Sequence, residues 1–327
     1  MIMKINGILK KFKQKKILIF GDSILDKYYF GNINRHSPES DIPIVDITKT
    51  EFRLGGAGNV ALNIQNLGGY PILFSVLGND IHGQEYLKLL NTNGIETNGI
   101  SIFKKIRTTT KHRVISDGNH IARFDEDEII NINEHIILKK FDNIISKCDI
   151  DVLLVQDYNK GLLSLNIINH IITKCKNFMI PIVVDPKKNN FFSYKFVDIF
   201  KPNLKEINDA FNSRNNQITS KSDLEFITSK LKNKINAKVI ILTLSENGMC
   251  LKSEDKYYHE KTLTKDVVDV SGAGDTVISI AALSLAANLN NEIIIKISNL
   301  AAGLVCKKIG VSPILKKDLN YKSLNIS

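Results

Sequence analysis

Short apolar runs alternate with longer helical patterns along most of this 327-residue chain, and this alternation restricts the possible folds more than any other feature. Strands that alternate with helices pair in parallel, and the helices pack on both faces of the sheet. The sequence therefore predicts a single α/β domain over residues 1–327, with a mostly parallel central sheet. Strands are expected at 16–20, 72–77, 151–155, 180–184, 198–200 and 239–244, and helices at 83–91, 134–147, 164–176, 204–211, 221–235, 275–288 and 292–307.

Polar residues gather directly after the predicted strands. Asp22 and Asp26 follow the first strand, and a single acid in such a place is also a common turn former. Because the carboxyl ends of parallel strands meet at one edge of the sheet, the whole set is expected to line a cleft. The same edge collects Asp157, Tyr158, Lys160, Asp185, Lys187, Lys201, Asn203, Glu206, Thr243 and Ser245.

A β-like run that ends at Val270 leads into the Ser-Gly-Ala-Gly-Asp turn at residues 271–275, and a long apolar helix pattern follows. Ser271 is expected to be the N-cap. Glycines at a helix start let an anion approach the backbone N–H groups, and the helix dipole favours negative charge there. A carboxylate in the same turn predicts that Asp275 is a general base beside a transferring phosphoryl group. An acid that only complements the helix dipole is an equally good interpretation of this turn taken alone.

Two stretches depart from the alternation and have the pattern of antiparallel strands. Residues 28–53 alternate apolar with polar side chains, and the runs 108–116 and 120–124 flank an Asp-Gly-Asn turn. They predict a small inserted sheet, a lid over the cleft built from about 32–53 and 101–124. Arg113 and Arg123 lie on this hairpin, where each is a candidate ligand for an anionic substrate or an ordinary solvated side chain.

The composition excludes several classes of protein. The net charge is +10, but the lysines are spread along the chain and few aromatic residues lie among them, which disfavours nucleic-acid binding. No segment reaches the ~18 consecutive apolar residues of a membrane span. The basic N-terminus lacks the apolar region of a signal peptide and predicts a short helix within residues 1–16. Four scattered cysteines and histidines without metal-ligand spacing are typical of a reduced, cytoplasmic protein.

Known nucleotide-binding signatures are absent or weak. No Gly-Lys dipeptide occurs, which excludes a P-loop. Residues 56–61 match Gly-x-Gly-x-x-Ala, with Asp80 downstream, but the preceding residues 48–53 are too polar for the buried strand that a dinucleotide fingerprint requires. A dinucleotide oxidoreductase is therefore a minor alternative. Phosphates would be held by the amides of 272–274 and by Mg²⁺, with Glu206 as its ligand through water or simply as a helix first-turn acid.

Three motifs, in family order, resemble the signatures of the PfkB family of ribokinase-like carbohydrate kinases. Residues 54–61, Leu-Gly-Gly-Ala-Gly-Asn-Val-Ala, are similar to its substrate motif, and residues 203–206, Asn-Leu-Lys-Glu, match its N-x-x-E motif. Residues 270–276, Val-Ser-Gly-Ala-Gly-Asp-Thr, resemble its second signature. Stretches at 21–26, 35–39, 157–161, 184–187 and 201–204 look more narrowly like heptose 7-phosphate kinases of lipopolysaccharide core synthesis, with Asp41, Asn159 and Lys188 as departures.

The resemblance implies a ribokinase-like fold and transfer of the ATP γ-phosphate to the anomeric hydroxyl of D-glycero-β-D-manno-heptose 7-phosphate, with ATP and Mg²⁺ as cofactors. Asp275 would be the base. The anion hole would be Gly272, Ala273 and Gly274. The sugar would contact Asp22, Asp26, Gly55, Gly56 and Asn59, and its phosphate Lys160, Arg113 and Arg123. The nucleotide would contact Asn203, Leu204, Lys205, Glu206, Thr243, Ser245 and Asn299.

The resemblance also bears on partners. The family often dimerises through its lid, so a homodimer is expected. Related kinases are often fused to an adenylyltransferase domain; none is expected in this chain, and a separate adenylyltransferase would act downstream. Another sugar or nucleoside kinase of the same fold is the second hypothesis. A non-catalytic sugar- or nucleotide-binding regulator is the third, and the intact Asp275 and Glu206 argue against it.

Overall fold

The central feature of the computed structural model is a nine-stranded sheet with the strand order β14-β13-β12-β11-β10-β9-β2-β5-β6. The structure describes residues 2–212, 220–263, 266–319 and 323–325, so Met1 of the predicted N-terminal helix lies outside it. The seven strands β12, β11, β10, β9, β2, β5 and β6 pair in parallel, as predicted. Strands β13 and β14 are antiparallel and form one edge of the sheet. The strands are β2 (Lys16–Gly21), β5 (Tyr70–Gly78), β6 (Ile100–Phe103), β9 (Val152–Gln156), β10 (Ile182–Asp185), β11 (Ile199–Phe200), β12 (Val239–Thr243), β13 (Met249–Lys252) and β14 (Tyr257–Glu260).

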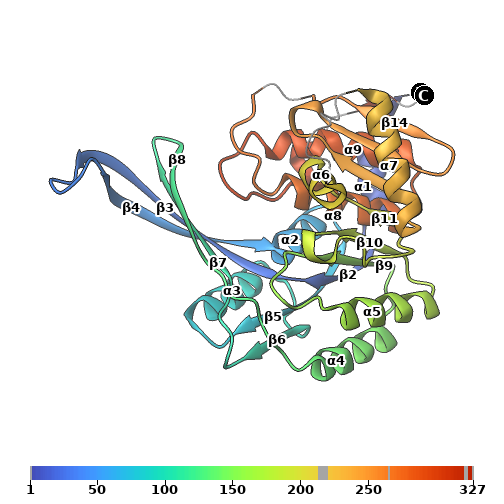
Figure 1. Ribbon diagram of the computed structural model, residues 1–327, viewed down its shortest axis with the longest axis horizontal. Coiled ribbons are helices and arrows are strands. Elements are labelled where there is room, and N and C mark those ends of the chain that lie inside the picture. The colour runs from blue at the N-terminus through green and yellow to red at the C-terminus, as the bar shows by residue number, and fades with distance from the viewer. Residues whose placement is uncertain (1, 213–219, 264–265, 320–322, 326–327) are drawn as a thin grey trace.

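Helices cover both faces of this sheet (Figure 1). Alternate strand residues face opposite ways, so Ile17 and Ile19 of β2 join one hydrophobic core while Leu18 and Phe20 join the other. The first core is closed by α1 (Ile5–Phe12), α2 (Ala57–Asn66), α3 (Ile81–Thr92), α8 (Ala273–Ala286), α9 (Asn291–Val305) and α10 (Lys316–Leu319). The second is closed by α4 (Glu134–Lys147), α5 (Leu165–Asn177), α6 (Leu204–Phe211) and α7 (Lys221–Ile235).

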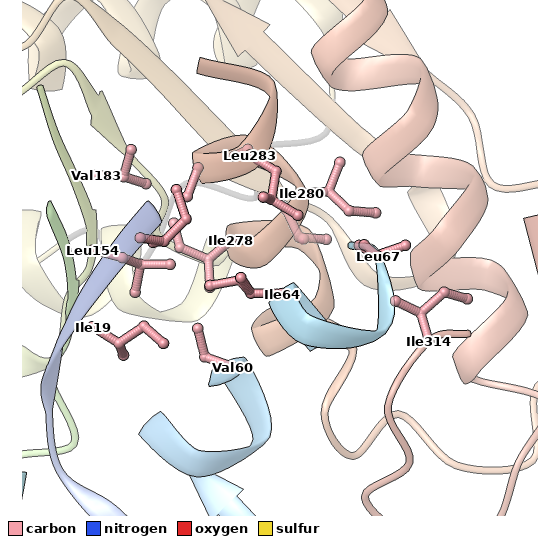
Figure 2. Close-up of a cluster of buried hydrophobic side chains, with 14 of the residues drawn as sticks. Ile19, Val60, Ile64, Leu67, Leu154, Val183, Ile278, Ile280, Leu283 and Ile314 are labelled. Carbon is pink, nitrogen blue, oxygen red and sulfur yellow. The ribbon is translucent and has the colours of Figure 1, made fainter. Parts of the chain in front are cut away.

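Helix α8 runs through the middle of the first core. Figure 2 shows Ile278, Ile280 and Leu283 of α8 among side chains from the sheet and from α2. Eleven residues of α8 are buried, and a helix that is apolar on every side is stable only inside a protein. The position of its first turn, which carries Asp275, is therefore fixed by core packing.

The inserted sheet is larger than the sequence indicates. It has the order β4-β3-β7-β8, and it consists of β3 (Ser23–His36), β4 (Pro43–Gly56), β7 (Thr110–Ser116) and β8 (Asn119–Glu126). Figure 1 shows it projecting from the body. The predicted boundaries need correction in two places: residues 101–103 lie in β6 of the main sheet, and residues 28–53 form parts of two 14-residue strands instead of several short ones.

Most predicted elements are confirmed to within about two residues, but the approach to α8 is not. Residues 266–270 form no strand, and the N-cap of α8 is Gly272, not Ser271. Gly272 has a φ of 82°, which glycine adopts far more readily than serine, so the chain turns one residue later than expected. Strand pair β1 (Ile2–Lys4) and β15 (Ser323–Asn325) was not predicted. No described helix combines the length and apolarity needed to cross a membrane.

The core makes a stability prediction. Leu154 on the central strand β9 is fully buried among the residues of Figure 2. Leu154→Ala should lower the free energy of unfolding by about 2–5 kcal/mol, because the cavity cannot close completely. The matched control Ile136→Ala, on α4 and 47% exposed, should change it by less than about 0.5 kcal/mol. Urea denaturation measures both, and equal losses would contradict the assignment of this core.

Candidate active site

Two cavities meet at the carboxylate of Asp275. The larger has a volume of ≈ 660 Å³ and the smaller ≈ 140 Å³, and Tyr158, Gly272 and Asp275 line both. Asp275 lies in the first turn of α8 and is only 4% exposed. A group in this position can touch one ligand in each cavity, so the two ligands would meet beside it.

Three donors hold the Asp275 carboxylate. Asn59 donates its side-chain amide to Oδ2 at 2.8 Å, while the Tyr158 hydroxyl and the Gln156 amide donate to Oδ1 at 2.9 and 3.2 Å. Burial raises the pKa of Asp275 to about 6, opposed mainly by the Asn59 hydrogen bond. The group is therefore still ionised at neutral pH and accepts a proton more readily than an ordinary aspartate.

The glycine turn before Asp275 leaves room for an anion. Ala273 turns its N–H to the Val270 carbonyl at 3.2 Å, so an anion at the start of α8 would meet the amides of Gly272 and Gly274. A Cβ atom added to Gly274 would lie 3.5 Å from the Lys201 ammonium. The partial charge of the helix and a full positive charge therefore converge on one point.

The larger cavity is lined by nearly all of the predicted nucleotide residues. Buried Lys201 and Asp185 form an ion pair of 3.1 Å at its wall. Apolar surface comes from Val267, Val277 and Ala302. The predicted residues that line it are Asn203, Leu204, Lys205, Thr243, Ser245 and Asn299, together with the Gly272–Gly274 turn.

Glu206 is the exception, because its two oxygens are already engaged. It forms a capping box at the start of α6, in which Oε2 accepts the Asn203 N–H at 2.8 Å, and Oε1 pairs with Lys187. A carboxylate held this way would contact Mg²⁺ through water more readily than directly. Asp185 is better placed to bind Mg²⁺ directly. Its buried Oδ1 forms an ion pair with Lys201 but has no hydrogen bond of good geometry.

The smaller cavity lies between the body and the inserted sheet. Asp26 of β3 and Arg113 of β7 form a buried ion pair at its wall, and Lys111 lines it two residues before Arg113. Gly55 lies beside this pair, since a Cβ there would stand 2.1 Å from Asp26 Oδ2. Gly56 also lines the cavity, whose charged wall suits a polar ligand that carries an anionic group.

Three predicted substrate residues lie elsewhere. Asp22 accepts the backbone N–H groups of Tyr158 and Lys160 at 2.7 and 3.2 Å, and burial raises its pKa to about 7. The Lys160 ammonium is 2.6 Å from Asp127, and both Asp22 and Lys160 line a separate, much smaller cavity. Arg123 pairs with Asp125 and is half exposed.

Comparison with known proteins identifies the family. The model described as pfkB family carbohydrate kinase matches residues 14–318. The chain belongs to this family. Proteins named Bifunctional protein HldE from Sulfurimonas denitrificans and Helicobacter pylori are 37% and 33% identical over 310 and 297 residues, which cover 94% and 90% of this chain and 64% of each of those proteins. The chain thus spans less than two thirds of the length of these relatives.

Solved structures of pfkB relatives have the same fold. The structure of phosphofructokinase-2 from Escherichia coli in complex with potassium matches with a TM-score of 0.78 and 18% sequence identity, and the match covers 94% of this chain and 97% of that one. This confirms the ribokinase-like fold. The dinucleotide interpretation of residues 56–61 is wrong, because these glycines join an antiparallel strand of the inserted sheet to α2.

The sequence analysis missed Gln156 and Lys111. Gln156 extends the predicted strand 151–155 by one residue and was passed over for the acids that follow it. Lys111 shares a strand face with Arg113, because alternate residues of a strand point the same way. The signal for Lys111 in the sequence is its position two residues before Arg113 on a predicted strand, which places both cations on one face.

The Asp26–Arg113 pair makes a prediction for stability. Arg113→Met leaves the buried Asp26 carboxylate without its counter-charge and should cost about 3–5 kcal/mol. The same substitution at Arg123, on the neighbouring strand but 51% exposed, should cost less than about 1 kcal/mol. Denaturant unfolding at pH 7.0 would distinguish them, and similar losses at both sites would show that the Asp26–Arg113 pair has no special structural role.

Proposed function

We propose that this pfkB kinase transfers the γ-phosphate of ATP to the anomeric hydroxyl of D-glycero-β-D-manno-heptose 7-phosphate, giving the 1,7-bisphosphate. The observation that carries the proposal is the place of Asp275 between a large and a small cavity. The motifs that resemble heptose 7-phosphate kinases, and the similarity to proteins named HldE, favour heptose 7-phosphate as the acceptor.

The geometry supports a direct in-line transfer. The sugar hydroxyl enters from the small cavity and donates its hydrogen bond to the Asp275 carboxylate, while the triphosphate lies in the large cavity against the Gly272–Gly274 turn. As the oxygen–phosphorus bond forms and the bond to ADP breaks, the hydroxyl proton moves to Asp275. The amides and Lys201 stabilise the charge on the migrating phosphoryl group.

Mg²⁺ is part of this proposal. Asp185 lines the larger cavity and would contact the ion through its buried Oδ1, and Glu206 would contact it through water. One or two carboxylates with retained waters are the usual protein contribution to a Mg²⁺–nucleotide site. The ion would neutralise charge on the β- and γ-phosphates, and Lys201 and Lys187 complete the positive field around them.

The phosphate of the acceptor needs its own cation. Lys160 was the first candidate from sequence, but its ammonium is bound to Asp127 outside the small cavity. Lys111 lines that cavity, with its ammonium 5.2 Å from the centre of the Tyr158 ring, and burial lowers its pKa. A dianionic phosphate beside it would offset that burial by stabilising the ammonium, so we assign Lys111 the larger role and keep Lys160, Arg113 and Arg123 as secondary candidates.

The proposal extends to assembly and location. The inserted sheet projects from the body and exposes the apolar side chains of Ile47 and Phe124, with Ile42 exposed in the β3–β4 turn, so we propose that this sheet pairs with a second copy in a homodimer. The four cysteines are free, as expected for a cytoplasmic enzyme. We further propose that an adenylyltransferase consumes the product.

The pKa of Asp275 predicts the pH dependence of turnover. Its folded value of about 6 lies above the usual range, so the carboxylate loses its basic form as pH falls through 6. The kcat/KM for the sugar phosphate, which reports the ionisation of the unliganded enzyme, should therefore drop about tenfold for each pH unit below 6. Steady-state rates between pH 5.0 and 8.0 measure this decline.

A control is required because the substrate phosphate also titrates near 6. Asp275→Asn should lower turnover by about 10²–10⁴ at pH 7.5 while ATP binding persists, and its residual rate should not decline as pH falls below 6. A decline that persists in this variant comes from titration of the substrate phosphate. Unchanged turnover in the variant would refute the role of Asp275 as base.

The acceptor is tested by a panel of sugar phosphates. Heptose 7-phosphate should be the best substrate, with phosphorus NMR showing a new anomeric phosphate. Lys111→Met should raise KM for the phosphosugar at least about tenfold while the KM for the unphosphorylated heptose changes little, and Lys160→Met should have a smaller effect. Preference for a different sugar phosphate would support another pfkB sugar kinase, and ATP binding without turnover on any sugar would support a non-catalytic regulator.

A further inference from the structure

His82, His112 and Glu126 converge at the base of the inserted sheet. One nitrogen of each histidine and a carboxylate oxygen of Glu126 all lie within 4.8 Å of one another. The three residues are too far apart in the chain for any metal-ligand spacing to show in the sequence, which is why the sequence analysis expected none. No part of the proposed kinase chemistry uses them.

The fold brings the three together from separate elements. His82 is the second residue of α3, and the N-cap Asp80 fixes that helix start by accepting the N–H groups of Gly83 and Thr108, each at 2.7 Å. His112 on β7 pairs with Phe124 on β8, and Glu126 lies two residues beyond Phe124. His112 and Glu126 therefore share one face of the sheet.

This face is the reverse of the one that lines the small cavity. Lys111 and Arg113 line the cavity, and His112 between them points the opposite way. On the same side as His112 lies Lys27, its neighbour on β3, whose ammonium is 5.0 Å from the Tyr29 ring centre and 5.3 Å from that of Phe52. The cluster is thus separated from the proposed sugar site by the thickness of the sheet.

His112 is held in an orientation that suits a metal ligand. Its Nε2 lies 2.8 Å from Glu126 Oε1, and its Nδ1 lies 3.1 Å from the Tyr29 hydroxyl. The ring packs beside those of Tyr29 and Phe124, with centroids 5.9 and 4.5 Å away, and His112 is 3% exposed. In metal sites the second nitrogen of a histidine is normally bound to a neighbouring polar group, which fixes the ring and its tautomer. Tyr29 supplies that contact here.

The His112–Glu126 contact alone would need no third residue, yet the His82 ring also turns toward it. Its Nδ1 lies 4.0 Å from Glu126 Oε2, and the two imidazole rings are 5.8 Å apart. Ligand atoms around a tetrahedral Zn²⁺ are about 3.3 Å apart, given bonds of about 2.0–2.2 Å. The side chains of His82 and Glu126 are 18% and 45% exposed, so both can close this gap on the fixed His112.

We propose that His82, His112 and Glu126 bind a Zn²⁺ ion, with water as the fourth ligand. Two imidazoles and one carboxylate suit Zn²⁺ better than Mg²⁺ or Ca²⁺, which prefer sets of oxygen ligands. The ion connects α3 of the body to β7 and β8 of the inserted sheet. It therefore ties the base of that sheet to the body and stands apart from the Mg²⁺ proposed for the nucleotide.

The test measures Zn²⁺ binding by the chelator-treated full-length protein, using isothermal titration against a competing chelator. One ion per chain is expected. His82→Gln and Glu126→Gln should each weaken binding at least about tenfold. The matched control is His135→Gln, since His135 is also the second residue of a helix and is exposed, and it should bind Zn²⁺ as the natural protein does.

Two further readouts exclude other binding sites. Zn²⁺ should raise the thermal unfolding temperature of the natural protein and of His135→Gln, but not of the two ligand variants. Two of the four free cysteines are partly exposed and could also bind the ion. Co²⁺ in place of Zn²⁺ tests this, and it should give visible absorption without thiolate charge-transfer bands. Absence of Zn²⁺ binding, equal binding in all variants, or thiolate bands would each overturn the proposal.

Discussion

Burial of the Asp275 carboxylate against three hydrogen-bond donors is the interaction on which this site depends. A shift of its pKa from 3.8 to about 6 means that ionisation inside the protein costs about 3 kcal/mol more than in water. That cost is fully present above pH 6 and vanishes below the ordinary pKa, so at neutral pH the folded state is less stable than it would be with a neutral side chain. The surrounding fold, above all the buried helix α8, must compensate for it.

The buried carboxylate also explains why polar side chains from two elements surround it. Asn59 of α2 donates to Oδ2, whereas Gln156 and Tyr158, at and just after the end of β9, donate to Oδ1. Asp22, between β2 and β3, accepts the N–H of Tyr158, which fixes the loop that carries the tyrosine hydroxyl. Asp22 is thus connected to Asp275 through Tyr158, although it lines neither of the two cavities.

The sequence predicted the body of the protein because helices and parallel strands leave a strong local pattern, and it placed α4, α6 and α7 to the residue. It also singled out the glycine turn and Asp275, since small residues at a helix start are visible in the chain, whereas Asn59 was predicted as a sugar contact and instead donates to Asp275. It failed where pairing between distant residues decides the outcome. Nothing local shows that Lys160 pairs with Asp127, that Glu206 pairs with Lys187, or that His82 meets His112.

The two faces of the inserted sheet carry different kinds of side chain. On one face, Asp26, Lys111 and Arg113 line a polar cavity, and on the other, Tyr29, His112 and Phe124 stack as a compact apolar row. A buried Asp26–Arg113 pair adds little net stability by itself, because desolvation offsets most of the attraction. The pair instead fixes the height of the charged wall above Gly55, where a Cβ would collide with Asp26. The absence of a side chain at Gly55 therefore leaves the room that Asp26 needs to line the small cavity beside Arg113.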